Sequence, residues 1–232
     1  MKIKSNNYKQ DKMKIIVTLI FLINISNVVC GQKVNAFIDD YFNQTLSSNV
    51  GGYSYVIFKE NDIVAQGGNG IAVPNAHQPK SMTSETRMQI ASCSKAITAI
   101  ALLKELENHT VNVETTLGKI LAHEFPKMSE LTKAITLKNL LTHKSGYNFG
   151  YLETPHKIGL EKLFSENPPN AIDSNMSYSN LNYAILRYVI EFISKTDYEE
   201  YVKTNILDKV PNNNFSLSSK VGDSHAYNFP VL

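Results

Sequence analysis

The chain has 232 residues, of which 43% are hydrophobic and 19% are charged, and its formal net charge is +2. This composition is typical of a globular protein with enough apolar material for a core, and the length suits one domain with a short leader. A charge this small, without a basic run interleaved with aromatic residues, argues against a nucleic-acid partner.

The N-terminus predicts an export signal. Five lysines precede the apolar stretch "IIVTLIFLINISNVV", which is followed by "CGQ". A basic region, an apolar core and small residues at a cleavage point are typical of a secretory signal peptide, and the stretch is shorter than the roughly 20 residues of a spanning helix. Residues 1–31 are therefore expected to be removed after Cys30 or Gly31, with Met13 as an alternative start. The mature protein would then be secreted or extracytoplasmic without a stable membrane span; an uncleaved anchor is the alternative.

The first half of the mature chain is predicted to hold a helix, a β-hairpin and a loop. "VNAFIDDYFNQTL" has helical spacing, and the β-rich runs "YSYVIF" and "DIVAQG" flank Lys59-Glu60-Asn61, as in a hairpin. The following "GGNGIAVPNAHQP" is expected to be a loop, with Gly67, Gly68 and Gly70 inside it. A helix then begins near Ser92, and its apolar residues surround the axis, which predicts a buried helix.

Helices dominate the second half. A short helix within "VETTLGKILAHEFP" is expected to stop at Pro126, and one within "ITLKNLLTHKSGY" to end at Ser145-Gly146. "KIGLEKLFSENPP" predicts another, "NLNYAILRYVIEFISK" a strongly amphipathic one, and Thr196 with Glu199 a capping box for the last. A hairpin followed by helices indicates an α+β domain over residues 32–232.

The first turn of the helix near Ser92 is unusual, because Ser92-Cys93-Ser94-Lys95 precedes an almost wholly apolar segment. A lysine in a buried helix is unfavourable unless it is paired or has a role. Ser92 and Lys95 would lie one turn apart on the same face, and both burial and the positive helix end favour a neutral amine that accepts the serine proton during attack on a carbonyl. The Ser92 backbone N–H would help to bind the oxyanion. Cys93 is expected to be a small buried filler, and S-x-x-K alone is a weak motif.

A second motif, Tyr178-Ser179-Asn180, immediately precedes the amphipathic helix. The phenol could relay a proton to a leaving group, and the amide could hold Lys95 or a substrate amide. The alternative is a helix cap beside a packed tyrosine. Tyr41-Phe42-Asn43 repeats the pattern within a predicted surface helix, and we discount it.

Three blocks in this order, "IASCSKAITAIALL", "ITLKNLLTHKSGY" and "YSNLNYAILRYVIEFISKTDYEEYV", resemble the serine beta-lactamase and penicillin-binding-protein superfamily, nearest to its class C beta-lactamase and D-alanyl-D-alanine carboxypeptidase type. The resemblance implies a beta-lactamase/transpeptidase-like fold. It implies Ser92 as the acylated nucleophile, Lys95 as its proton-handling partner, and Tyr178 as general base or acid with Asn180 nearby at the substrate. His143, Ser145 and Gly146 match a block better known for shaping the fold, so His143 is not expected to be a catalytic base.

One element of the family pattern is not found in its usual context. The family carries a Lys or His followed one residue later by Gly on a strand beside the nucleophile, and the only counterpart after Tyr178 is Lys220-Val221-Gly222 in a loop-like segment. We therefore expect the C-terminal strands and helix of the family to be missing. The hairpin would then lack most of its sheet, and the Ser92 helix would lose part of its cover.

No metal or cofactor is expected. The six histidines lack the short spacing of zinc ligands, and no phosphate-binding glycine motif occurs. The sequence thus predicts a secreted serine hydrolase acting on a small-molecule or peptide substrate (an amide, a beta-lactam or an ester). A non-catalytic remnant or binding protein, or a fragment of a longer enzyme, is the alternative, and the oligomeric state stays open.

Overall fold

The computed structural model describes residues 33–46, 51–72, 80–148, 157–172, 175–211 and 215. The predicted signal peptide and Lys220 lie outside the described residues. Described residues up to Gln89 form one compact unit, and those from Ile90 onward form a second. Each unit is described by itself.

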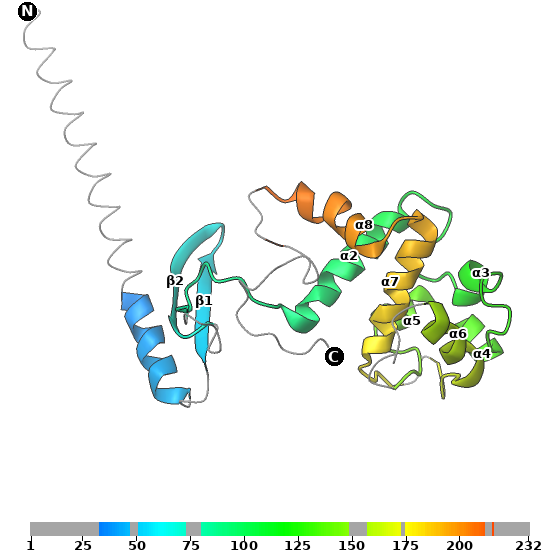
Figure 1. Cartoon of the computed structure of the whole chain (residues 1–232), viewed down its shortest axis with the longest axis horizontal. Helices are drawn as coiled ribbons and strands as arrows, with labels where there is room; N and C mark the ends of the chain where they lie inside the picture. Colours follow the sequence, from blue (N-terminus) through cyan, green and yellow to red (C-terminus); the bar gives the residue numbers. More distant parts are fainter. Residues whose placement is uncertain are drawn as a thin grey trace, which may run out of the picture. The chain divides into compact units, whose positions relative to one another are not determined.

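The first unit contains a helix over residues 33–45 and a β-hairpin, as predicted (Figure 1). Strands β1 (Gly52–Lys59) and β2 (Asp62–Gly70) pair antiparallel, with an irregularity in register between Ile57 and Phe58. The helix is tied to the hairpin through tyrosines of β1. The Tyr53 hydroxyl donates to Asp39 Oδ1 at 3.1 Å, and its ring lies 4.7 Å from that of Phe42.

The prediction that Gly67, Gly68 and Gly70 lie in a loop is wrong, because all three belong to β2. The strand needs glycine because other chain segments approach it closely. A Cβ on Gly68 would lie 2.9 Å from the Thr83 Cα, and Gly70 has a φ of +87°. Glycine inside a strand commonly marks such a close backbone approach.

The second unit is helical among its described residues (Figure 1). Its helices are α2 (Ser94–Leu106), α3 (Leu117–Leu121), α4 (Glu130–Ala134), α5 (Leu137–Leu141), α6 (Lys157–Glu166), α7 (Asn180–Ser194) and α8 (Tyr198–Asn205), with 3₁₀ turns at Ala91–Cys93 and Leu207–Lys209. Helix α7 packs against α2, α5 and α8, and its predicted amphipathic face is confirmed, since Leu186 and Ile190 are fully buried. The core of this unit is therefore organised around α7.

Two helix ends and the presence of one short helix differ from the predictions. Helix α5 ends at Leu141, before Ser145-Gly146, and His143 follows with a left-handed φ of +57°. Helix α8 is capped by Asp197, which accepts from the backbone N–H groups of the first turn, so the capping box predicted at Thr196 is wrong. Helix α4 was not predicted. It has only five residues, too few for a periodic pattern, and its N-cap Ser129 fixes its start.

Helix α2 is not buried on all sides among the described residues. Leu102 is fully buried, whereas Ile100 is 54% and Leu103 is 47% exposed. The all-round apolar pattern of this helix had predicted burial, and the structure confirms it for one face only.

Candidate active site

Ser92 lies in the 3₁₀ turn that leads into α2, and the residue before it is strained. Ala91 has a φ of +44°, a left-handed conformation that non-glycine residues rarely adopt. The Ser94 hydroxyl donates to the Ala91 carbonyl at 2.6 Å and so braces the turn. Such strain commonly persists at functional sites because surrounding contacts maintain it.

The four residues singled out by the sequence come together here. The Ser92 Oγ lies 2.7 Å from the Tyr178 hydroxyl and 3.2 Å from the Lys95 Nζ. The Lys95 Nζ also donates to the Asn180 Oδ1 at 2.7 Å. Helix α2 supplies Lys95, and the start of α7 supplies Asn180, because Ser179 caps α7 by accepting from the Leu181 N–H. The sequence left a helix cap and a site motif as alternatives for Tyr178-Ser179-Asn180. The structure shows both, because Ser179 caps α7 while Tyr178 and Asn180 contact Ser92 and Lys95.

The site is more open than the sequence predicted. Ser92 is exposed, Lys95 is partly exposed, and 53% of Tyr178 is accessible. Lys95 meets its partners directly: besides its two hydrogen bonds, its Nζ lies 4.9 Å from the centre of the Tyr178 ring. Lys95 beside the phenol, and then the hydrogen bond from Ser92, lower the pKa of Tyr178, against a smaller opposing effect of burial. A lower pKa favours the phenolate form of Tyr178, in which its oxygen can accept a proton.

His143 contacts the site from the side. Its ring centre lies 4.5 Å from that of Tyr178 and 5.4 Å from that of Tyr183, and its Nδ1 accepts from the Ser179 N–H at 3.2 Å. Partial burial, and then the nearby Lys95 charge, lower the pKa of His143. His143 thus contacts Tyr178 and the residue after it, and its role stays a prediction.

Sequence reasoning missed Asn182, which is fully buried on α7 and forms hydrogen bonds with Ser145 and His143. Its Oδ1 accepts from the Ser145 hydroxyl at 2.5 Å, and its Nδ2 lies 3.1 Å from the His143 Nδ1. The available signal was an amide on the apolar face of an amphipathic helix, since buried polar groups need partners.

The expectation that Cys93 is a buried filler is wrong, because its side chain is exposed. In the 3₁₀ turn, Cys93 lies between Ser92 and Ser94 on the outer surface rather than on the buried face of α2.

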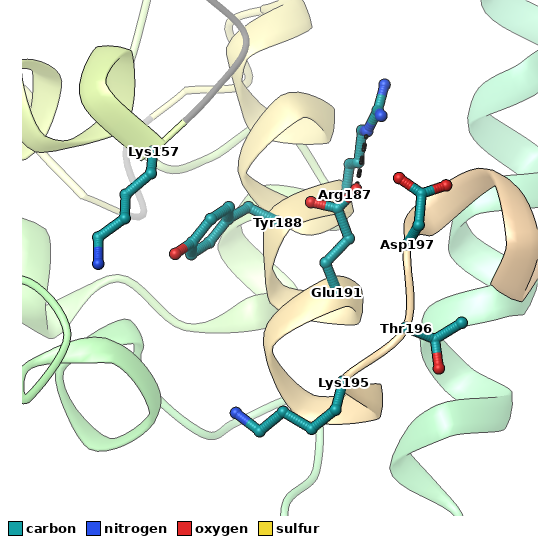
Figure 2. A pocket seen from close by; sticks show the side chains of 7 residues that line it. All are labelled: Lys157, Arg187, Tyr188, Glu191, Lys195, Thr196 and Asp197. Atoms are coloured by element: carbon teal, nitrogen blue, oxygen red, sulfur yellow. Dashed lines mark hydrogen bonds and ion pairs between the residues drawn. The ribbon is translucent and has the colours of Figure 1, made fainter.

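A hollow of about 520 Å³ lies among described residues that do not include Ser92 (Figure 2). It is lined by Lys157 of α6, by three residues of α7 and by the turn into α8, and so lies toward the other end of α7 from Asn180. Its cations have protein partners: Lys157 pairs with Glu124, Arg187 with Glu191, and the Lys195 Nζ lies 4.0 Å from the Phe192 ring centre. We therefore regard it as an ion-paired surface hollow.

Within the part of the chain that the structure describes, no group of three or more His, Cys, Asp or Glu side chains could hold a metal ion. Likewise, none of the described helices is both long and apolar enough to cross a membrane.

Comparison with known proteins adds the family context. The family model described as Beta-lactamase matches residues 35–227. The Bacillus subtilis protein PbpX is 32% identical over 155 residues, which cover 65% of this chain and 37% of PbpX. The acyltransferase MokF of Monascus pilosus is 28% identical over 154 residues, which cover 54% of this chain and 36% of MokF. The chain thus spans little more than a third of the length of these curated relatives.

Solved structures agree in fold. An octameric penicillin-binding protein homologue from Pyrococcus abyssi matches with a TM-score of 0.59 and 26% identity, over 76% of this chain and 42% of its own. A class C beta-lactamase matches with a TM-score of 0.63 over 79% of this chain and 49% of its own, and at 16% identity it shows the fold alone. The predicted beta-lactamase/transpeptidase-like α+β fold is confirmed over the matched part.

Proposed function

This chain belongs to the beta-lactamase family, and on that premise we propose that it is an exported serine hydrolase that forms an acyl-enzyme at Ser92. The observation that supports this most is the 2.7 Å contact between the Ser92 Oγ and the Tyr178 hydroxyl, with the Lys95 Nζ 3.2 Å from the same oxygen. Nucleophile and proton acceptor within hydrogen-bond reach, with a third group orienting them, is the arrangement that covalent catalysis requires.

The proton transfer needs Tyr178 in its phenolate form, with the Ser92 hydroxyl as the donor of the 2.7 Å hydrogen bond between them. In the proposed reaction, the Ser92 Oγ bonds to the acyl carbon while its proton passes to the Tyr178 phenolate, which becomes the neutral phenol. Tyr178 then returns the proton to the departing nitrogen or oxygen as the bond to that atom breaks. Water then attacks the carbonyl carbon of the Ser92 ester and gives a proton to Tyr178. Tyr178 returns a proton to the Ser92 Oγ as the ester bond breaks.

Lys95 and Asn180 are proposed to hold the other charges. The Lys95 Nζ lies 4.9 Å from the centre of the Tyr178 ring, where its charge would stabilise the phenolate form that accepts the serine proton. Asn180 fixes Lys95 through its Oδ1 and would offer its Nδ2 to a substrate carbonyl. The Ser92 backbone N–H is the proposed oxyanion donor from this chain.

The chemistry defines a substrate class. Any small molecule or peptide with an acyl carbon and a nitrogen or oxygen leaving group fits, which includes beta-lactams, D-amino-acid peptides and esters. The chain spans only 37% and 36% of the two relatives named above. We therefore propose the chemistry that these substrates share and do not choose one substrate.

Covalent labelling tests the proposal. Full-length protein is treated with a fluorescent penicillin and, separately, with a fluorophosphonate, and adducts are measured by in-gel fluorescence and intact mass. We expect one adduct per chain, lost in Ser92→Ala. Cys93→Ala is a matched control in the same exposed turn and is expected to keep the label. Equal labelling of wild type and Ser92→Ala would remove Ser92 from the nucleophile role.

The competing function is that of a non-catalytic binding protein, in which Ser92 forms no acyl-enzyme. A folded protein that no acylating probe labels at any pH would support it over hydrolysis.

Export is the second part of the proposal, and the N-terminal sequence supports it. Protein recovered outside the cytoplasm should begin after Cys30 or Gly31. N-terminal sequencing that finds residues 13–29 retained would contradict cleavage.

A further inference from the structure

His143 contacts three consecutive residues, 177–179, of the segment that carries Tyr178 and Asn180. Its backbone carbonyl accepts from the Ser177 N–H at 2.9 Å, its Nδ1 accepts from the Ser179 N–H at 3.2 Å, and its ring stacks beside Tyr178 at 4.5 Å. Tyr178 is 53% exposed, and besides His143 it contacts Ser92 and Lys95. His143 is thus one of three side chains that contact the phenol.

The surrounding hydrogen bonds fix the protonation state of the ring. The Tyr147 N–H donates to the Ser145 hydroxyl at 3.1 Å, and this hydroxyl donates to the Asn182 Oδ1 at 2.5 Å. The amide of Asn182 must then present its Nδ2, a donor, to the His143 Nδ1 at 3.1 Å. An Nδ1 that accepts from two N–H groups carries no hydrogen, so His143 is neutral with its proton on Nε2.

Resting on the proposed function, we propose that neutral His143 is a positioning residue for Tyr178, and that protonation of its Nδ1 releases the Ser177–Asn182 segment and slows acylation of Ser92. Because Nε2 already carries a hydrogen, the next proton can bind only at Nδ1. It would place a donor against two donors, the Ser179 N–H and the Asn182 Nδ2. The segment would have to move, and Tyr178 with it.

The groups around the ring oppose its charging. The titratable groups that face His143 are Lys95 from α2, Tyr178 from the segment before α7, and Tyr183 from α7. Burial, and then the Lys95 charge, favour the neutral ring and lower the pKa of His143. With the folded-state pKa below the unfolded value of about 6.5, the stabilisation by neutral His143 is present above about pH 6.5 and is lost as the pH falls through the lower folded-state value.

The decisive variant is His143→Asn. Asparagine accommodates the left-handed φ of +57° better than most residues, and its Oδ1 can replace Nδ1 as the acceptor without titrating. At pH 8 we expect this variant to be labelled at a rate within a few-fold of wild type. Below that pH, the labelling rate of the variant should depend on one proton fewer than the labelling rate of wild type. One controlling proton slows the reaction about tenfold for each pH unit below its pKa.

His143→Ala and a surface control complete the set. His143→Ala removes the acceptor and the ring, and we expect labelling to fall about 10 to 100-fold at pH 8, as a displaced catalytic group would cause. His123→Asn makes the same exchange at an exposed histidine and should retain the wild-type profile. An unchanged acid limb in His143→Asn would overturn the proposal.

A second measurement separates this inference from the proposed function. In two-dimensional NMR of the full chain, the Ser179 amide and the Tyr178 ring signals should shift with the titration of the His143 imidazole, and should not shift in that pH range in His143→Asn. If no probe labels Ser92 but these signals titrate together, hydrolysis fails while the positioning role stands. If Tyr178 is indifferent to the titration of His143, the positioning role fails whatever the labelling shows.

Discussion

Different atoms of Tyr178 make its contacts with His143 and with Ser92. The ring of Tyr178 rests on His143, while its hydroxyl reaches Ser92. Asn182 lies wholly within the supporting layer, bonded to Ser145 and His143. Removing one atom from the site can therefore test chemistry without disturbing the support.

Tyr178→Phe is the cleanest such change. It keeps the ring contact with His143 and removes only the hydroxyl, so we expect the rate of Ser92 labelling to fall about 100 to 10,000-fold, the typical contribution of general acid–base catalysis. Because Tyr178 is half exposed, the free energy of unfolding should change by less than about 0.5 kcal/mol. Labelling kinetics and urea unfolding measure the two quantities. Tyr188→Phe, toward the other end of α7, is the control, and a loss of labelling in both variants would count against a specific role.

At the scale of elements, side-chain caps mark where α3, α4, α5, α7 and α8 begin. Helices α3, α4 and α5 have five residues each, too few to persist alone in water, and each starts at a Ser or Thr whose hydroxyl accepts from the first turn. The same holds for α7 at Ser179. Ser179, the N-cap of α7, lies between Tyr178 and Asn180 in the chain. The start of this helix therefore positions both side chains of the site.

The cap of α8 gives a stability prediction. The Asp197 Oδ1 accepts from the Glu199 N–H at 2.9 Å and the Glu200 N–H at 3.3 Å. Asp197→Ala should lower the free energy of unfolding by about 1 kcal/mol, the usual cost of losing a cap. Thr196→Ala should cost less than about 0.5 kcal/mol, because its hydroxyl bonds only to Ser194 near the surface. Urea unfolding of both variants decides between them; a larger loss in Thr196→Ala would favour the capping box predicted from sequence.

What the sequence could predict depends on how local the cause is. The apolar spacing of α7 and the β-rich runs around Lys59-Glu60-Asn61 are local patterns, and they gave the correct elements. The strand glycines, of which Gly68 is an example, follow from the approach of Thr83, a contact that periodicity does not contain. The motif S-x-x-K and Tyr178-Ser179-Asn180 indicated which residues would gather, whereas the contacts of His143 and Asn182 depend on how α5 and α7 pack.

At the scale of the molecule, the core of the helical unit lies on one side of α2. Helix α7 and α8 pack against this helix, and they bury Ala101, Leu102 and Leu106. Ile100 and Leu103 point elsewhere and are half exposed. The helix that carries Lys95 is thus held by one face.

Two adjacent leucines test that asymmetry. Leu102 is fully buried, so Leu102→Ala should lower the free energy of unfolding by about 2 to 5 kcal/mol through lost burial and a residual cavity. Leu103 is 47% exposed, so Leu103→Ala should cost less than about 1 kcal/mol. The two changes remove the same atoms from neighbouring positions of one helix, so helix propensity cancels and only burial differs. Urea unfolding of the full chain measures both. Equal losses would mean that α2 is covered on both faces in solution, as its all-round apolar sequence predicts, and that the face beside Ile100 has a partner of its own.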